Sequence, residues 1–314
     1  MTCVREIRFD ESDSVYGVAT SLDGELLAVG LQKNVRLFTR HGKFVTTLDG
    51  GNTFANYVTF SPAGLSPLLL ATSSSDGSVR VWDCSNRACV ANLQSHSFKS
   101  AYSVVFSPNG RLLAMASDWK IVQLWRTDDW NAPSVTLVGG STWPLRLAFS
   151  CDSRLLATNA GNMSLWHFPD SNTLTAVAID TKDKTVSYCL VFSSVDTELL
   201  ACGSEDGGLV LSRVGASTEV VDRKLQGHER GVWGVAFSPC GKQLASASMD
   251  QTVRLWCVTS GVCLRMLWEH SYGAFGVAFL SNGKQLVTVY HDSTVRIWTL
   301  CAWHDRVHHL FGAR

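Results

Sequence analysis

The sequence predicts an all-β fold of seven similar units that close into a ring, each unit a four-stranded antiparallel sheet. Three observations support this: a repeat, regularly spaced turn residues, and short apolar runs between the turns. The repeat is clearest at an anchor position that is usually Phe and is often followed by Ser-Pro. It falls on Thr20, Phe60, Phe106, Phe149, Phe192, Phe237 and Phe279. The steps of 40 to 46 residues match the length of one propeller blade.

The sixth copy shows the elements of one unit in order. An innermost strand is expected at Val232 to Phe237, followed by the turn Ser-Pro-Cys-Gly at 238–241. A second strand is expected at Gln243 to Ser248, and after the turn at 249–251 a third strand runs from Val253 to Trp256. Units of this size cannot bury both faces alone, so they must stack on neighbours, and a closed ring protects the sheet edges.

The fourth and outermost strand of each unit is predicted from two apolar residues three positions apart. The pairs are Val45 with Leu48, Val90 with Leu93, and Leu264 with Leu267. The N-terminus repeats this pattern with Val4 and Ile7, yet no unit precedes it. We therefore expect the N-terminal strand to close the ring as the outer strand of the last unit, beside the strands around 275–298.

Recurring sequence motifs at the two ends of the unit resemble those of a known family. The sixth copy opens with Gly227-His228, and the second closes with Trp82-Asp83. The closing aromatic recurs at Phe38, Trp82, Trp125, Trp166, Trp256 and Trp298, and Ser212 replaces it in the fifth copy. Over roughly residues 3–299 the chain resembles the WD40-repeat family, which implies a seven-bladed β-propeller over 1–299. Residues 300–314 form a tail, in which Trp303, Val307, Leu310 and Phe311 have the spacing of a short amphipathic segment.

The resemblance also implies a buried tetrad of His, Ser or Thr, Asp and Trp within a blade. Two copies match it completely. These sets are His228, Ser246, Asp250 and Trp256 in the sixth copy, and His270, Thr288, Asp292 and Trp298 in the seventh. A buried indole N–H, hydroxyl and imidazole each need a hydrogen-bond partner. Because these residues recur at blade spacing instead of converging on one point, we interpret them as structural and predict no catalytic residues.

Composition and motifs exclude several functional classes. Lys plus Arg and Asp plus Glu both number 27, so no net charge attracts nucleic acid or an anionic membrane. No phosphate-binding loop, nucleophile elbow or cofactor motif occurs, and no cofactor is expected. Cys301, His304 and His308 offer three ligands without a fourth, so no metal site is predicted. A charged start and unpaired cysteines indicate an intracellular protein, cytoplasmic or nuclear.

The most informative functional pattern is the residue four positions before each anchor. In the family this position lies near the top of the central channel. Here it holds Tyr16, Asn56, Tyr102, Leu145, Tyr188, Trp233 and Phe275, of which five are aromatic. Phe54 and Trp143 stand two residues earlier, and Ser75, Glu205, Met249 and His291 occupy a second top-facing position before or at the turn. These side chains either fill the inner core or form a rim that binds a partner.

We interpret the chain as a non-enzymatic scaffold that binds a peptide or protein partner on this aromatic rim. With Glu205 and Asp118 close by, an apolar or cationic anchor on the partner is expected. Two alternatives stay open among binding proteins, a ubiquitin-ligase substrate receptor and a reader of modified peptides. An enzyme with a site at the channel mouth is the alternative from another class. The ring itself is expected to be a monomer, compatible with a place in a multiprotein complex.

Overall fold

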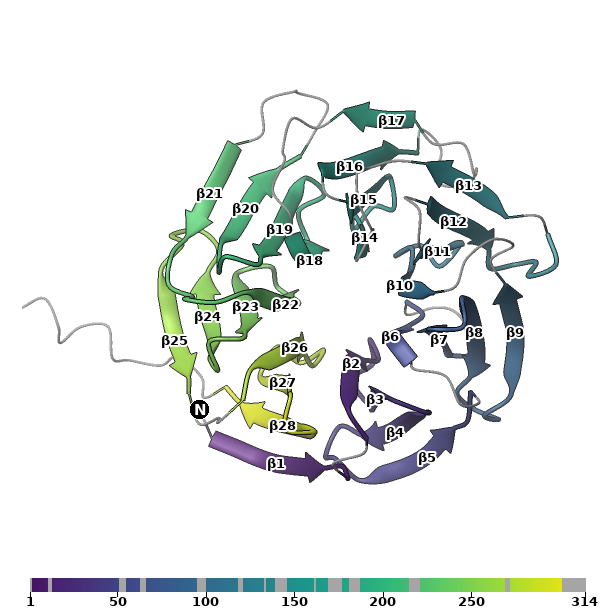
Figure 1. Ribbon diagram of the computed structural model, residues 1–314, viewed down its shortest axis with the longest axis horizontal. Helices are drawn as coiled ribbons and strands as arrows, with labels where there is room; N and C mark the ends of the chain where they lie inside the picture. The colour runs from purple at the N-terminus through teal and green to yellow at the C-terminus, as the bar shows by residue number, and fades with distance from the viewer. Residues whose placement is uncertain are drawn as a thin grey trace, which may run out of the picture.

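The computed structural model is a ring of seven antiparallel sheets around a central axis, each with four strands (Figure 1). This confirms the predicted fold class. The structure describes residues 2–10, 13–50, 55–62, 66–94, 100–117, 121–132, 134–138, 146–160, 162–168, 177–180, 187–214, 221–268 and 272–300. The predicted tail at 301–314 lies outside these residues. No membrane-spanning helix is found within the described ranges.

Every blade adds its strands in order from the channel outward. The innermost strands are β2 (Val15–Thr20), β6 (Ala55–Phe60), β10 (Ala101–Phe106), β14 (Leu147–Phe149), β18 (Ser187–Phe192), β22 (Val232–Phe237) and β26 (Ala274–Phe279). The second strands are β3 (Leu26–Leu31), β7 (Leu69–Ser74), β11 (Leu112–Ser117), β15 (Leu155–Ala160), β19 (Leu199–Ser204), β23 (Gln243–Ser248) and β27 (Gln285–Tyr290). The third strands are β4 (Val35–Thr39), β8 (Ser78–Asp83), β12 (Ile121–Arg126), β16 (Asn162–His167), β20 (Leu209–Arg213), β24 (Val253–Cys257) and β28 (Thr294–Thr299). The outer strands are β5 (Phe44–Leu48), β9 (Cys89–Gln94), β13 (Val135–Val138), β17 (Val177–Asp180), β21 (Val221–Leu225), β25 (Cys263–Leu267) and, for blade 7, β1 (Thr2–Arg8).

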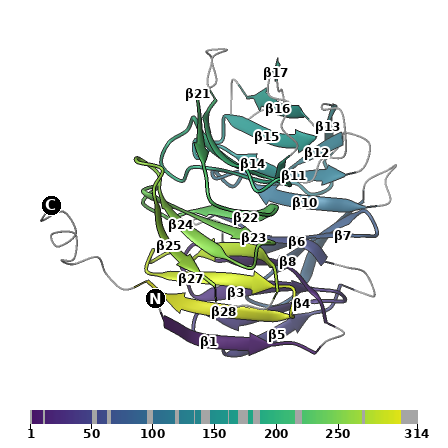
Figure 2. The same ribbon diagram turned by 60° about the vertical axis from the view of Figure 1, so that its left-hand side comes forward.

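The N-terminal strand closes the ring, as the sequence predicted. β1 pairs antiparallel with β28, with Ile7 opposite Val295, and completes the sheet β1-β28-β27-β26. Figures 1 and 2 both show β1 alongside β28 at the outside of blade 7. Beyond the ladder, Glu6 forms an ion pair with Arg296 at 2.9 Å, and the Phe9 amide donates to the Ser293 carbonyl at 3.1 Å. The two ends of the propeller are therefore joined by main-chain and side-chain contacts.

The core lies between blades, where the two faces of each sheet meet their neighbours. The second strands β7 and β11 are buried along their whole length, which explains their small and aliphatic residues. Apolar clusters cross the blade borders; one of them joins Val81 of blade 2 to Phe106 of blade 3. Neighbouring blades thus complete each other's cores.

The two apolar residues of each outer-strand pair differ in burial. Leu48, Leu93 and Leu267 are buried, but Val90 is 44% exposed and Val4 is 53% exposed. The first member of each pair is the extra residue of a β-bulge, because the ladder skips Val4, Val45, Val90 and Leu264. A bulged residue lies outside the pairing, so its side chain no longer follows the alternation of the strand.

In four blades the turn between the second and third strands contains a left-handed residue. Gly77 and Gly207 supply it in blades 2 and 5, with φ of 80° and 87°. Blades 6 and 7 instead have Gln251 at 71° and Ser293 at 58°. A residue with a Cβ adopts this conformation at a cost of about 1–2 kcal/mol.

Gln251→Gly is therefore expected to stabilise the protein. The gain should be about 0.5–1 kcal/mol, since relief of strain exceeds the extra entropy of glycine in the unfolded chain. Urea unfolding curves of the two proteins measure it. Gln251→Ala is the matched control, because alanine keeps the strain. Equal stabilisation by both changes would contradict this explanation.

Candidate functional site

The rim positions share one backbone feature, a β-bulge at the start of the innermost strand. In six blades the ladder between the first two strands skips one residue near its upper end. The skipped residues are Tyr16, Asn56, Tyr102, Tyr188, Trp233 and Phe275. They are the residues that stand four positions before the anchor in these blades. A bulge re-aims the side chain of its extra residue, and here six blades repeat the same local geometry.

These bulges meet at a cavity of about 370 Å³ at one end of the ring, which we call the channel-mouth pocket. The innermost strands that carry them surround the central axis in Figure 1. The residues that line the pocket are Ser14, Val15, Tyr16, Asn56, Tyr102, Arg146, Tyr188, Trp233, Phe275 and His291. Five aromatic side chains from blades 1, 3, 5, 6 and 7 are thus brought together although about 40 residues or more separate them in sequence.

The aromatic residues on one side of the pocket form a continuous row. Tyr188 stacks on Trp233 with ring centroids 4.5 Å apart, and Trp233 meets Phe275 edge to face at 5.7 Å. Phe275 in turn lies 5.0 Å from the His291 ring. Gly231 lets the chain approach the indole closely, because a Cβ there would lie 3.1 Å from Trp233 Nε1. The contacts hold the row in one arrangement.

Exposure distinguishes these side chains from the buried core. Tyr16 is 41% exposed, and Tyr102, Tyr188, Trp233 and Phe275 are half-buried. The anchor residues Phe106, Phe192, Phe237 and Phe279, four positions later, are buried. The rim aromatics are therefore not enclosed between blades, and they offer solvent-accessible apolar surface inside a concave site.

Polar groups flank the row. Partial burial and a hydrogen bond to Glu205 raise the pKa of Tyr188, because its hydroxyl donates to the carboxylate in the protonated form. Arg146 lies over the Tyr57 ring, with its guanidinium carbon 5.0 Å from the ring centroid. The Asn56 side chain donates to the Ala101 carbonyl at 2.8 Å and so connects blade 2 to blade 3. The pocket therefore combines an aromatic row with a cation on another blade.

The sequence pattern anticipated most of this lining and missed part of it. Glu205 and Met249 lie near the row without lining the pocket: Glu205 contacts Tyr188, and Met249 Sδ lies beside Gly273. Phe54, Asp118, Trp143 and Leu145 lie outside the described residues. Arg146 was missed, because alignment on Phe149 pointed to its neighbour Leu145 in blade 4. In the structure Arg146, directly before β14, lines the pocket.

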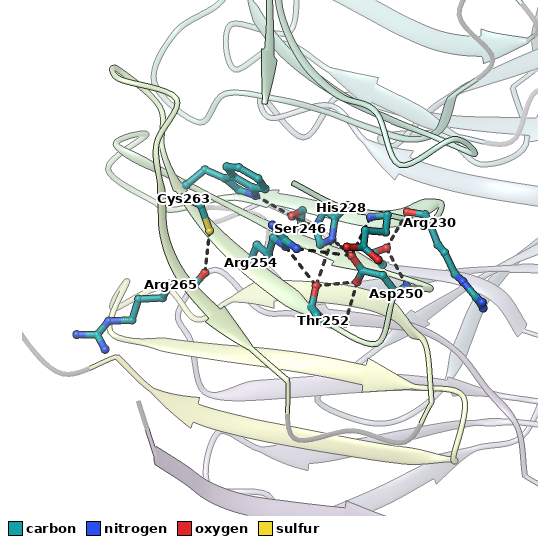
Figure 3. Close-up of polar contacts among 11 residues, drawn as sticks. His228, Arg230, Ser246, Asp250, Thr252, Arg254, Cys263 and Arg265 are labelled. Carbon is teal, nitrogen blue, oxygen red and sulfur yellow. Dashed lines mark hydrogen bonds and ion pairs between the residues drawn. The ribbon is translucent and has the colours of Figure 1, made fainter. Parts of the chain in front are cut away.

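The sixth-blade tetrad forms one buried chain of hydrogen bonds (Figure 3). Trp256 Nε1 donates to Ser246 Oγ at 2.8 Å, and Ser246 Oγ lies 2.7 Å from His228 Nε2. His228 Nδ1 lies 2.7 Å from Asp250 Oδ2. Because the serine oxygen accepts from the indole, its own proton goes to Nε2, which leaves Nδ1–H to donate to the carboxylate. This series of hydrogen bonds connects the tight turn to the second and third strands.

Other blades keep parts of this arrangement. In blade 7, Trp298 Nε1 donates to Thr288 Oγ1 at 2.7 Å, and Asp292 accepts from the Thr294 amide at 3.1 Å. His270 lies outside the described residues. In blade 2, Trp82 Nε1 donates to Thr72 Oγ1 at 3.2 Å. Trp256, Trp298, Ser246 and Thr288 are all buried, as expected for groups that join strands.

Asp250 should make stability depend on pH. Burial alone would raise its pKa, but hydrogen bonds from His228 and Thr252 lower it well below 3.8. The unfolded state therefore binds the proton first, so the stabilisation is complete above about pH 5 and is lost as pH falls through the folded pKa. As the pH is lowered from about 7 to 2, the melting temperature should fall more steeply for the wild type than for Asp250→Asn. An equal fall of the two melting temperatures would contradict this assignment.

The part of the chain that the structure describes holds no cluster of three or more His, Cys, Asp or Glu side chains suited to a metal. Cys301, His304 and His308 lie outside that part. Among the described lining residues of the pocket, the ionisable groups other than tyrosine are Arg146 and His291. These groups sit on blades 4 and 7, and His291 lies against Phe275.

Comparisons with known proteins agree with the geometry. The model of the WD40 family, described as WD domain, G-beta repeat, matches residues 40–83, 87–126, 220–257 and 261–299, about half of the chain. The chain is 28% identical over 196 residues to apoptotic protease-activating factor 1 of Danio rerio, covering 62% of this chain and 15% of that protein. It is 28% identical over 231 residues to nuclear distribution protein PAC1 of Arthroderma benhamiae, covering 64% and 49%. It is 29% identical over 202 residues to protein hir-1 of Neurospora crassa, covering 61% and 17%. The chain thus spans at most about half the length of these relatives.

Proposed function

Since this chain belongs to the WD40-repeat family, we propose that it is a non-enzymatic interaction scaffold that binds a peptide segment of a protein partner in the channel-mouth pocket. The family fold hosts many tasks, so the proposal depends on the side chains of this chain. An intracellular location belongs to the same proposal.

The observation that carries the proposal is the convergence of five half-buried or exposed aromatic side chains on one concave site. Aromatic residues in a partly enclosed pocket are typical hot spots of binding. The Tyr188–Trp233–Phe275 row is held in place by its own ring contacts. Such a surface loses little conformational freedom when a partner binds, which favours affinity.

The size of the pocket indicates what it can hold. A volume of about 370 Å³ lies at the lower end of the range for ligand sites, about 300–1,000 Å³. It accommodates the side chains of a short segment, not a folded domain. The rest of the partner would lie on the surrounding rim, where Glu205 is exposed. No particular observation favours the ligase-receptor, modified-peptide or enzyme alternatives over this binding role.

Trp233→Ala should separate binding from folding. The loss of two ring contacts should cost no more than about 2 kcal/mol of stability, because the side chain is half-buried and leaves no closed cavity. Partner capture should weaken by about 2 kcal/mol or more, roughly 30-fold in affinity. Affinity capture and a thermal melt on the same preparation measure the two effects.

Trp268→Ala is the matched control. Trp268 is 74% exposed and lies at the end of the outer strand β25, away from the pocket lining. The Trp268→Ala variant should keep both the stability and the partner capture of the wild type. A Trp233 variant that binds normally, or a Trp233 variant that loses several kcal/mol of stability, would remove the pocket as the binding site. Loss of capture in the Trp268 variant alone would place binding on the outer edge instead.

A further inference from the structure

The charges of the channel-mouth pocket differ from those expected from the sequence. Glu205 suggested a site for a cationic anchor. In the structure, however, none of the described lining residues is acidic, and Arg146 is the lining residue with a permanent charge. The remaining polar groups include the hydroxyls of Tyr16 and Tyr102 and the amide of Asn56. Hydroxyl and guanidinium groups can donate hydrogen bonds to an anion.

Arg146 is held by its surroundings on both sides of its backbone. Its amide donates to Asn159 Oδ1 at 2.8 Å, and its carbonyl accepts from Thr158 Oγ1 at 3.0 Å. Its guanidinium lies over the Tyr57 ring. A cation–π contact of this kind uses the ring face, and the planar guanidinium carries N–H groups in a geometry that matches a carboxylate. Blade 2 therefore supports the Arg146 side chain while blade 4 fixes its position.

Glu205 contributes less to the field inside the pocket. Its carboxylate accepts a hydrogen bond from the Tyr188 hydroxyl, and its side chain is exposed at the rim. An exposed charge is screened by water and salt more strongly than one within a concave site. Among the described lining residues, Arg146 therefore supplies the permanent positive charge, and the aromatic row supplies the apolar surface of the same pocket.

We propose that the channel-mouth pocket recognises an acidic anchor, a Glu or Asp side chain adjacent to an apolar or aromatic residue of the partner. The carboxylate would pair with Arg146, and the apolar residue would lie on the Tyr188–Trp233–Phe275 row. One guanidinium matches one carboxylate, whereas a phosphoryl group carries about −1.5 to −2 charges and typically binds an arginine cluster. This inference rests on the binding role proposed above and adds the chemistry of the partner.

Capped tetrapeptides test it without knowledge of the natural partner. The probes are Gly-Phe-Glu-Gly, its isosteric amide Gly-Phe-Gln-Gly, Gly-Phe-Lys-Gly and the phosphoserine version, each titrated into the full chain by ligand-observed NMR. The Glu peptide should bind about fivefold or more tightly than the Gln peptide at low salt. That preference should shrink when the ionic strength rises from about 0.05 M to 0.5 M.

Variants separate this inference from the proposed function. Arg146→Gln should abolish the preference for Glu, so that the Glu and Gln peptides bind with equal affinity. Arg126→Gln, which alters an exposed arginine paired with Asp128, is the matched control and should keep the preference. Trp233→Ala should weaken the binding of both peptides equally.

Every other outcome overturns either the acidic anchor alone or both proposals. Binding that needs Trp233 but does not distinguish Glu from Gln overturns the acidic anchor and leaves the pocket as the binding site. A preference for Lys or for phosphoserine also overturns the carboxylate. Binding that is indifferent to Trp233→Ala, or no binding by any probe at millimolar concentration, overturns both proposals.

Discussion

Deleting residues 1–9 is expected to open the ring and destabilise the whole propeller. The deletion removes β1 from its ladder with β28, together with buried Phe9, half-buried Ile7 and the ion pair of Glu6 with Arg296. Burial of a large apolar side chain contributes roughly 1.5–3 kcal/mol, so the total loss should be on the order of 5 kcal/mol. Domains of this kind have only about 5–15 kcal/mol of stability. Thermal melts and size-exclusion chromatography should show a much lower Tm and aggregation through the open edge.

Val4→Thr provides the control for that deletion. Val4 is the bulged, exposed residue of β1, so the change keeps the strand and should hardly alter the melting temperature. A truncated protein that stays monomeric and melts like the wild type would show that strand closure contributes little to the stability of the ring.

Trp256→Ala is the second change with a large expected effect. The side chain is 1% exposed and packs in the core between blades 5 and 6. Removing a buried side chain of this size should cost about 3–5 kcal/mol. The change also takes the indole donor from Ser246 and disturbs the chain to His228 and Asp250. Urea unfolding should measure the loss.

His228→Ala should cost less than Trp256→Ala, since less apolar surface is lost, but it leaves Ser246 and Asp250 without a buried partner. Trp268→Ala again serves as the tryptophan control, because that side chain is largely exposed. If the Trp256 and His228 variants kept full stability and lost a specific activity, the tetrad would have a functional role instead of a structural one.

The fold could be predicted because its main signal is periodic. An anchor that is buried in six of the seven blades, such as Phe237, and turns at similar spacing are imposed by the same packing problem in each blade. Ring closure followed from the unpaired apolar pattern at the N-terminus. Local departures from strand geometry could not be predicted in this way, as exposed Val4 and Val90 show. A bulge depends on backbone pairing, and residue type alone does not reveal it.

The candidate site was predictable to the extent that it repeats. Trp233 and Phe275 were found because their positions correspond in every blade. Arg146 was not found, since alignment on Phe149 points to its neighbour Leu145 and the pattern gave no reason to choose the next residue. The sign of the charge expected at the site was affected in the same way, because Glu205 and Asp118 were counted and Arg146 was not. One side chain outside the aligned positions therefore changes the chemistry inferred for the pocket.

The bulges of the innermost strands bear on how this protein can change over evolutionary time. Each of these six rim residues is the one that the register between the first two strands of its blade skips. A substitution there is expected to leave the strand register and the anchor four residues later unchanged. The six positions, each in a different blade, can therefore vary without a change of register, while the contacting side chains of Tyr188, Trp233 and Phe275 are coupled to one another. Mutation can in this way change the chemistry of the channel-mouth pocket while the ring keeps its fold.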